Sequence, residues 1–148
     1  MNIFQKLTSA LALCFLAFTA SAEQPVIEVF KSPSCQCCSH WEDHLRENGF
    51  KVISRMSNNI GAVKQHFNIP RNLASCHTGV INGYFIEGHV PASDIKKLLA
   101  EQPAIRGLTV PGMPAGQNVP GMETRPGNDT YDVLAVGEEK VTVFNHYE

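Results

Sequence analysis

Three cysteines, Cys35, Cys37 and Cys38, lie within four residues and give this 148-residue chain its strongest chemical signal. The ionised thiolate is the form of cysteine that attacks disulfides and binds soft metal ions, so the cluster indicates redox chemistry or metal ligation. A structural disulfide between Cys35 and Cys38 is the alternative interpretation, and it leaves Cys37 without a role. A fourth cysteine, Cys76, lies well downstream.

The cysteine cluster lies where a strand is expected to pass into a helix. Residues 26–30 are apolar and β-branched enough to predict a buried strand. Downstream, Trp41 and Leu45 fall on the same helical face as Cys38. Gly49 is expected to end this helix. The last two cysteines of the cluster should then lie in the first helical turn, where free N–H groups and the helix dipole favour thiolate over thiol.

The remaining sequence predicts a regular alternation of elements. Asn82-Gly83 is a strong signal for a two-residue hairpin turn, and Pro91 is typical of a first helical turn. The predicted order is β-α-β-α-β-β-α, which resembles the thioredoxin-like fold, an α/β fold with a central mixed sheet and flanking helices. The predicted elements after the first helix are a strand over 51–55, a helix over 58–67, strands over 78–81 and 84–87, and a helix that buries Ile95, Leu98 and Leu99.

This order also predicts where Cys76 lies. In the thioredoxin-like arrangement, the segment that enters the third strand packs beside the cysteine motif. Here that segment is residues 75–78. We therefore expect Cys76 to meet Cys35, Cys37 and Cys38 in a site with four sulfur atoms.

Four thiolates form a soft donor set, and soft ligands select Cu(I) over hard cations. Zinc is the natural competitor, because four cysteines also form closed tetrahedral zinc sites. Such zinc sites usually combine two separated Cys-x₂-Cys pairs, whereas three of these cysteines crowd into one turn. Crowded thiolates repel one another, and bridging Cu(I) ions would neutralise their charge. The pattern therefore indicates a multinuclear Cu(I) cluster.

Four further residues are candidate copper ligands. Met113 and Met122 occur in a repeated Pro-Gly-Met context within residues 102–128, a Pro- and Gly-rich segment that is predicted to be an irregular loop. Packing of these methionines against the protein is the alternative interpretation. His77, which is adjacent to a cysteine, and His89 are each candidate ligands, although a single histidine is more often structural.

The N-terminal residues 1–22 have the pattern of a cleaved export signal. Lys6 supplies the positive charge, and an apolar stretch precedes the small residues Ala20-Ser21-Ala22. Cys14 is expected to leave with this segment. The exported chain is then residues 23–148, which is long enough for one domain with its own core.

Charge limits the classes of partner. Removing Lys6 takes the formal net charge from −2 to −3, and no basic cluster is present. Nucleic acid, or a membrane after signal removal, is therefore not an expected partner. Residues 131–144 predict a terminal β-hairpin that could extend the sheet.

With the Cys-x-Cys-Cys motif at residues 35–38 and the Ser-Cys-His-Thr motif at residues 75–78, the chain resembles the CopG-like family, which comprises periplasmic, thioredoxin-fold copper-resistance proteins. The Cys-x-Cys-Cys and Ser-Cys-His-Thr motifs are the most specific part of this resemblance. It implies a bacterial periplasmic protein that binds copper through Cys35, Cys37, Cys38 and Cys76, in a multi-copper cluster. It further implies a role in copper resistance by conversion between Cu(I) and Cu(II), with other periplasmic copper-handling proteins as partners. The matching segments are residues 31–38, 73–78, 83–91 and 110–114.

Three hypotheses stay open on the sequence. The first is a copper-binding protein that sequesters the ion or changes its redox state, which would make it a copper oxidoreductase. The second is a thiol–disulfide oxidoreductase that uses Cys35 and Cys38. The third is a structural or interaction module stabilised by one zinc ion. The sequence does not decide whether the protein is an enzyme.

Overall fold

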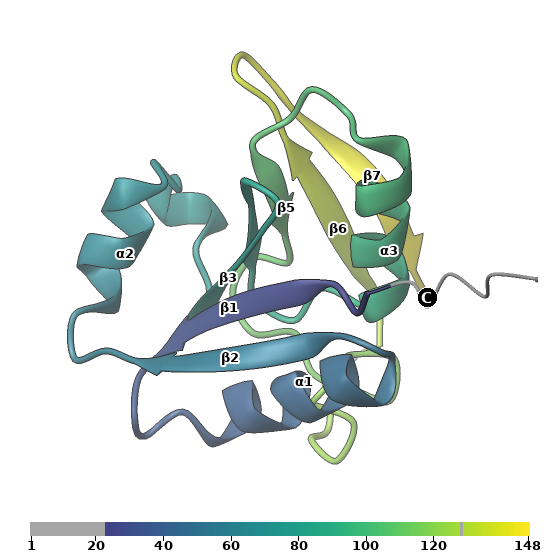
Figure 1. Cartoon of the computed structure of the whole chain (residues 1–148). Helices are drawn as coiled ribbons and strands as arrows, with labels where there is room; N and C mark the ends of the chain where they lie inside the picture. Colours follow the sequence, from purple (N-terminus) through teal and green to yellow (C-terminus); the bar gives the residue numbers. More distant parts are fainter. Residues whose placement is uncertain (1–22, 128) are drawn as a thin grey trace, which may run out of the picture.

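The computed structural model describes residues 23–127 and 129–148, so the predicted signal segment and Cys14 lie outside the described residues. The protein is a mixed α/β structure, as predicted, and the expected order β-α-β-α-β-β-α is present from Val26 to Glu101. Figure 1 shows the elements in space. In chain order they are β1 (Val26–Lys31), α1 (Gln36–Glu47), β2 (Lys51–Met56), α2 (Ile60–His66), the 3₁₀ turn η1 (Arg71–Leu73), β3 (His77–Ile81), β4 (Tyr84–Glu87), α3 (Ala92–Glu101), β5 (Gly107–Thr109), β6 (Tyr131–Val136) and β7 (Val141–Tyr147).

Seven strands form one mixed sheet in the order β2-β1-β3-β4-β5-β6-β7. The pairs β1/β2 and β4/β5 are parallel, and the other neighbours are antiparallel. Strands β1 and β3 run antiparallel, with Lys31 opposite His77. The last residue of β1 and the first residue of β3 therefore lie side by side. This register positions the two cysteine-bearing segments next to each other.

The sheet buries an apolar cluster on each face. Trp41 of α1 and Ile95 of α3 share the larger cluster, so both helices cover the same face. The neighbouring residues Phe85 and Ile86 of β4 belong to different clusters, as expected when successive strand residues point to opposite faces. The second cluster contains Leu73 of η1, and Figure 1 shows α2 set apart from α1 and α3.

Helix α1 ends where its sequence predicts. Gly49 has a φ of +88°, a left-handed conformation that glycine adopts without strain. The Gly49 amide donates to the Arg46 carbonyl, and the Phe50 amide donates to the Leu45 carbonyl, both at 3.1 Å. This is a Schellman motif, and the burial of Leu45 and Phe50 in one cluster completes it. The helix that carries the cysteines is therefore anchored at its far end.

Two predictions about local structure need correction. The helix predicted over 58–67 is shorter, because the side chain of Asn59 caps it by accepting from the Ala62 amide at 3.0 Å, and none of its residues is buried. The segment 102–128 is not irregular throughout, because β5 lies within it and joins β4 to β6. Strand β5 has only three residues, so its identity depends on its two neighbours in the sheet.

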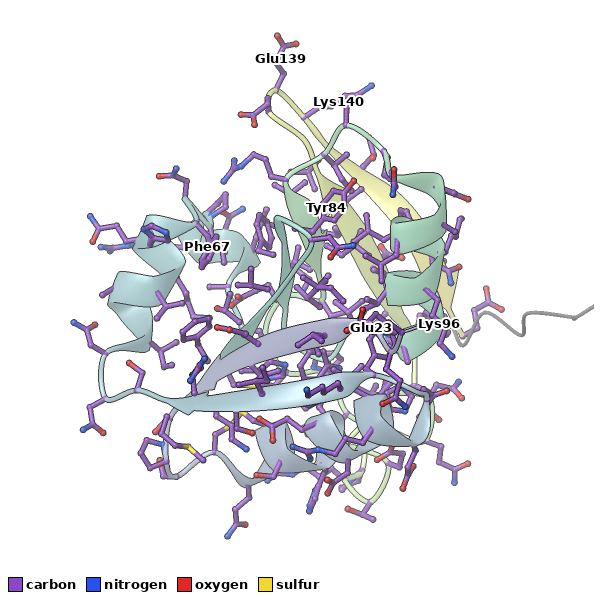
Figure 2. All side chains as sticks on the ribbon, viewed as in Figure 1. Glu23, Phe67, Tyr84, Lys96, Glu139 and Lys140 are labelled. Atoms are coloured by element: carbon purple, nitrogen blue, oxygen red, sulfur yellow. A yellow bond between two sulfur atoms is a disulfide. The ribbon has the colours of Figure 1, made fainter. Side chains whose placement is uncertain are left out.

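The predicted terminal hairpin is present as β6 and β7, which extend the edge of the sheet as far as Tyr147. Its turn projects from the body of the protein, with Glu139 and Lys140 at the tip (Figure 2). In the described part of the chain, no helix has the length and apolar character needed to cross a membrane.

Candidate metal centre

The first turn of α1 presents the cysteine cluster. Cys35 occupies the N-cap position with extended backbone, and its amide donates to the Ser32 carbonyl at 3.1 Å. Cys37 and Cys38 follow in the first helical turn, as predicted. Cys38 is fully buried on the same face as Trp41, whereas Cys35 and Cys37 are half-buried. The cluster is therefore held on the core but open to one side.

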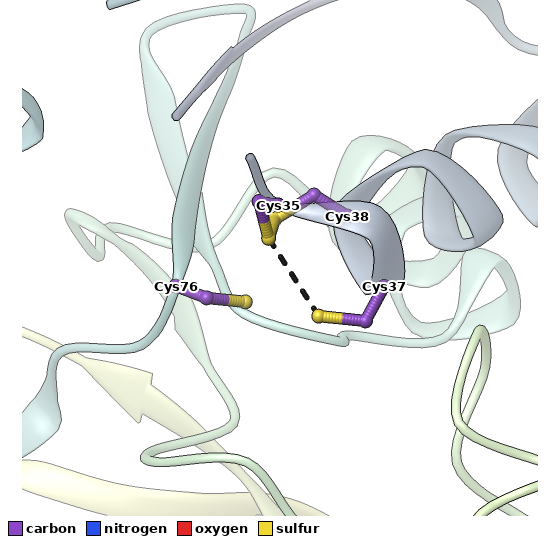
Figure 3. A group of neighbouring side chains, drawn as sticks. All are labelled: Cys35, Cys37, Cys38 and Cys76. Atoms are coloured by element: carbon purple, nitrogen blue, oxygen red, sulfur yellow. Dashed lines mark hydrogen bonds between the residues drawn. A yellow bond between two sulfur atoms is a disulfide. The ribbon is translucent and has the colours of Figure 1, made fainter. Parts of the chain in front are cut away.

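Cys76 joins this cluster from the segment immediately before β3. The Sγ atoms of the four cysteines all lie within 4.8 Å of one another, which confirms the predicted proximity. The Cys35 and Cys37 sulfurs are 3.6 Å apart. Figure 3 shows Cys76 and Cys37 pointing toward each other, one from each segment.

A disulfide joins Cys35 and Cys38, whereas Cys37 and Cys76 are free thiols. The sequence favoured four ligating thiolates over this disulfide, so the observed state differs from that expectation. The physical reason is local: the Cys-x-x-Cys spacing across the start of a helix sets the two Cα atoms 5.4 Å apart, within the range that a disulfide spans. Two of the four sulfurs can thus leave and rejoin the set of metal ligands by a change of redox state.

Burial makes the Cys76 thiol a weak acid. Loss of solvent around its side chain, and secondly the nearby sulfur of Cys37, raise the pKa of Cys76 from 9.0 to about 11. The expectation that thiolates are favoured near the helix start therefore does not extend to Cys76. A metal ion that binds this sulfur at neutral pH must displace a proton.

Two histidines complete the site, and both were predicted as candidates. His77 Nδ1 is 3.3 Å and His89 Nε2 is 3.6 Å from the Cys76 sulfur. The three residues form a second group whose potential ligand atoms lie within 4.8 Å of one another. Burial lowers the pKa of both histidines, so both rings are neutral and can offer a lone pair.

The orientation of His89 is fixed by a backbone carbonyl. Its Nδ1 donates to the Pro120 oxygen at 2.6 Å, which leaves the lone pair on Nε2 directed at Cys76. A carbonyl that accepts from the far nitrogen is the usual support of a metal-binding histidine. His77 instead stacks on Trp41, with ring centres 4.2 Å apart, and its buried Nε2 has no hydrogen-bond partner in the described structure. The nitrogen of His77 that faces the Cys76 sulfur is Nδ1, so Nδ1 is the atom that could bind a metal ion there.

Both copies of the Pro-Gly-Met repeat contact this region. In the first, the Gly112 amide donates to the Ala74 carbonyl at 3.1 Å, two residues before Cys76. In the second, Pro120 binds His89, and a Cβ added to Gly121 would lie 2.6 Å from the Trp41 amide nitrogen. The repeat therefore holds the surroundings of the cysteines in place.

The methionines of the two copies differ in exposure. Met122 is 2% exposed and packs in the larger core cluster, which agrees with the packing alternative. Met113 is 57% exposed, directly after the hydrogen-bonded Gly112. Copper ligation by either sulfur stays a prediction.

Two residues that support the surroundings of the site, His44 and Glu87, were not identified from the sequence. The His44 Nε2 accepts from the Ala92 amide at 3.1 Å and so caps α3, a contact that the sequence around His44 does not indicate. Glu87 lies fully buried behind Cys76, and nothing in its local sequence marks it as a buried carboxylate. Both roles depend on contacts between distant segments.

The fold and the site together define a mixed α/β protein with a half-buried cysteine cluster that can bind a metal ion and that contains a dithiol–disulfide pair. Comparison with a family model described as a protein of unknown function, DUF411, gives a match over residues 73–122. That segment contains Cys76, both histidines and both methionines of the candidate site. Comparison with curated proteins gives no match.

Two solved structures, named copper resistance protein copG forms 2 and 1, are each 42% identical to the chain. The first covers 85% of this chain and 100% of its own, with a TM-score of 0.79. The second covers 84% of this chain and 98% of its own, with a TM-score of 0.77. The chain therefore belongs to the CopG family.

Proposed function

We propose that the protein binds Cu(I) through Cys35, Cys37, Cys38 and Cys76 as a multinuclear thiolate cluster and contributes to copper resistance. The observation that carries this proposal is the approach of all four sulfurs to within 4.8 Å. Four thiolates at that separation repel one another, and Cu(I), a soft cation that bridges thiolates, would remove the repulsion. The names of the two related structures support copper as the ion.

A redox step follows from the pair that forms the disulfide. In the reduced protein, two thiolates of Cys35 and Cys38 can give one electron each to two Cu(II) ions, which yields one disulfide and two Cu(I) ions. The reverse step oxidises two Cu(I) ions and regenerates the dithiol. The disulfide seen here is the oxidised end of this couple. The protein would then act as a copper oxidoreductase.

His77 and His89 can serve as copper ligands during this redox step. When Cys35 and Cys38 are joined, the remaining donors are two thiols, from Cys37 and Cys76, and the imidazoles of His77 and His89. Imidazole binds copper well, and a mixed set of sulfur and nitrogen donors is less selective for Cu(I) than four thiolates. The donor set would therefore change together with the oxidation state of the cysteines.

We also propose a fold class and a cellular location for the protein. The strand order β2-β1-β3-β4 with α1 between β1 and β2 supports a thioredoxin-like core. The export pattern of residues 1–22 supports a periplasmic location, where copper ions and other copper-handling proteins would be the partners.

Copper titration under anaerobic conditions tests the proposal. The fully reduced protein should bind more than one Cu(I) per chain, and Cys76→Ser should bind fewer. Protein kept in the Cys35–Cys38 disulfide form should also bind fewer Cu(I) ions. Binding of a single zinc ion in preference to copper, with unfolding when it is removed, would contradict the proposal and favour a structural zinc site.

A second candidate function is thiol–disulfide exchange, which the observed disulfide at the start of α1 favours. This activity predicts that the reduced, metal-free protein reduces a model disulfide substrate. It should be lost in Cys35→Ser. A metal-free protein without reductase activity would exclude it.

A further inference from the structure

The fully buried carboxylate of Glu87 contacts the residue that precedes Cys76. Glu87, the last residue of β4, is opposite Thr78 of β3 in the sheet and has no exposed surface. An ionised carboxylate is costly to bury unless it is paired and hydrogen-bonded. The groups that bind the Glu87 carboxylate therefore indicate its role.

Three segments of the chain supply the partners of Glu87. Lys64 of α2 forms an ion pair with Glu87 Oε1. The Thr78 hydroxyl donates to Oε2 at 2.7 Å. The third donor is the backbone amide of Ser75, at 2.6 Å from Oε1, and Ser75 immediately precedes Cys76. The carboxylate thus connects α2 and β3 to the segment that carries the fourth sulfur.

The neighbouring glycine brings the same segment close to β4. Gly88 has a φ of +74°, and a Cβ added there would lie 2.7 Å from the Ser75 Cβ and 2.5 Å from the Val110 carbonyl oxygen. On its other side, the Ser75 hydroxyl donates to the Gly112 carbonyl. Ser75 is therefore held between the end of β4 and the first Pro-Gly-Met copy.

We propose that Glu87 is a positioning residue for the metal site: by accepting the Ser75 amide it holds Cys76 against the other cysteines. This inference rests on the proposed binding of copper through the four cysteines. Cys76 lies one residue before β3 begins, so the hydrogen bond to Ser75 restrains the backbone where the sheet ladder has not yet started. Lys64 balances the buried charge that this restraint requires.

Two conservative variants separate the effect of the length of the Glu87 side chain from the effect of its charge. Glu87→Asp keeps the charge but shortens the side chain by one methylene, so its carboxylate cannot reach the Ser75 amide. Glu87→Gln keeps the length and one carbonyl oxygen for that amide, but it leaves Lys64 without its charged partner. A matched control is Asp94→Asn, which alters another buried carboxylate that accepts from Asn145 and Tyr147 and has no contact with Ser75.

Each variant is measured for Cu(I) affinity by competition with a chelator, for hydrogen exchange of the Ser75 amide without metal, and for thermal midpoint. Glu87→Asp should lose roughly 10- to 100-fold in Cu(I) affinity, the usual effect of removing a group that supports a metal ligand. Its Ser75 amide should exchange faster. Glu87→Gln should keep slow exchange and near wild-type affinity even where its thermal midpoint falls. Asp94→Asn should lower only the thermal midpoint.

The inference is overturned if Glu87→Asp keeps both the affinity and the slow exchange of the wild-type protein. It is also overturned if both Glu87 variants lose affinity in proportion to their thermal midpoints, since that result indicates a purely structural role. Should the wild-type protein fail to bind Cu(I), the proposed function fails. The exchange of the Ser75 amide then still decides whether Glu87 positions this segment.

Discussion

Replacing Cys37 by serine should make the Cys76 thiol more acidic. Burial is the first cause of the raised pKa of Cys76, about 11, and the neighbouring Cys37 sulfur is the second. The substitution removes the second cause and leaves the first. The pKa of Cys76 should therefore fall in Cys37→Ser but stay above its ordinary value of 9.0.

The size of the effect follows from the wild-type shift. Moving the pKa of a thiol from 9.0 to about 11 lowers its thiolate fraction at neutral pH about 100-fold. Because the thiolate is the nucleophile, the alkylation rate of Cys76 should rise about tenfold per pH unit up to that raised pKa. In the variant the rate should level off at a lower pH.

Mass spectrometry can follow iodoacetamide labelling of Cys76 at several pH values while the Cys35–Cys38 disulfide is intact. Cys76→Ser gives the background labelling in the same peptide. A wild-type pKa at or below 9.0 would refute the role of burial. An unchanged pKa in Cys37→Ser would refute the coupling between the two sulfurs.

Three further perturbations test other parts of the structure. Copper should quench the fluorescence of Trp41, the only tryptophan, because its ring lies 4.2 Å from a histidine of the site; unchanged emission on copper addition would contradict this placement. Burial lowers the pKa of His44, so the unfolded chain takes up its proton first as the pH falls through about 6.5, and the thermal midpoint should drop there. His77 and His89 contribute a similar dependence, because burial also lowers their pKa, so His44→Gln should weaken the drop without abolishing it; an identical pH profile would argue against the cap on Ala92. Finally, Gly107→Ala should destabilise the fold by about 1–3 kcal/mol in chemical denaturation, since the new Cβ would lie 2.1 Å from the Phe85 carbonyl oxygen; wild-type stability would refute this.

The sequence allowed prediction of features that depend on short-range signals. The start of α1 at the cysteines and its end at Gly49 follow from local residue types, and so does the hairpin turn at Asn82-Gly83, where both residues have positive φ. The approach of Cys76 to the cluster followed from the order of elements, which fixes the neighbours of β3. These features are the ones that place the four sulfurs.

Other features required contacts that no local pattern encodes. Strand β5 is recognised only by its two neighbours, and α2 is held by a cap and an ion pair rather than by a buried stripe. Glu87 is buried because Lys64 and the Ser75 amide reach it from other segments. The disulfide between Cys35 and Cys38 depends on redox state, which the order of residues does not specify.

The most direct test of the central claim is X-ray absorption at the copper edge on the reduced protein loaded with Cu(I). A multinuclear cluster predicts a first shell dominated by sulfur and a second shell from neighbouring copper atoms, both diminished in Cys76→Ser. A single copper with mainly nitrogen or oxygen neighbours, unchanged in Cys76→Ser, would contradict the claim that the four cysteines form one copper site.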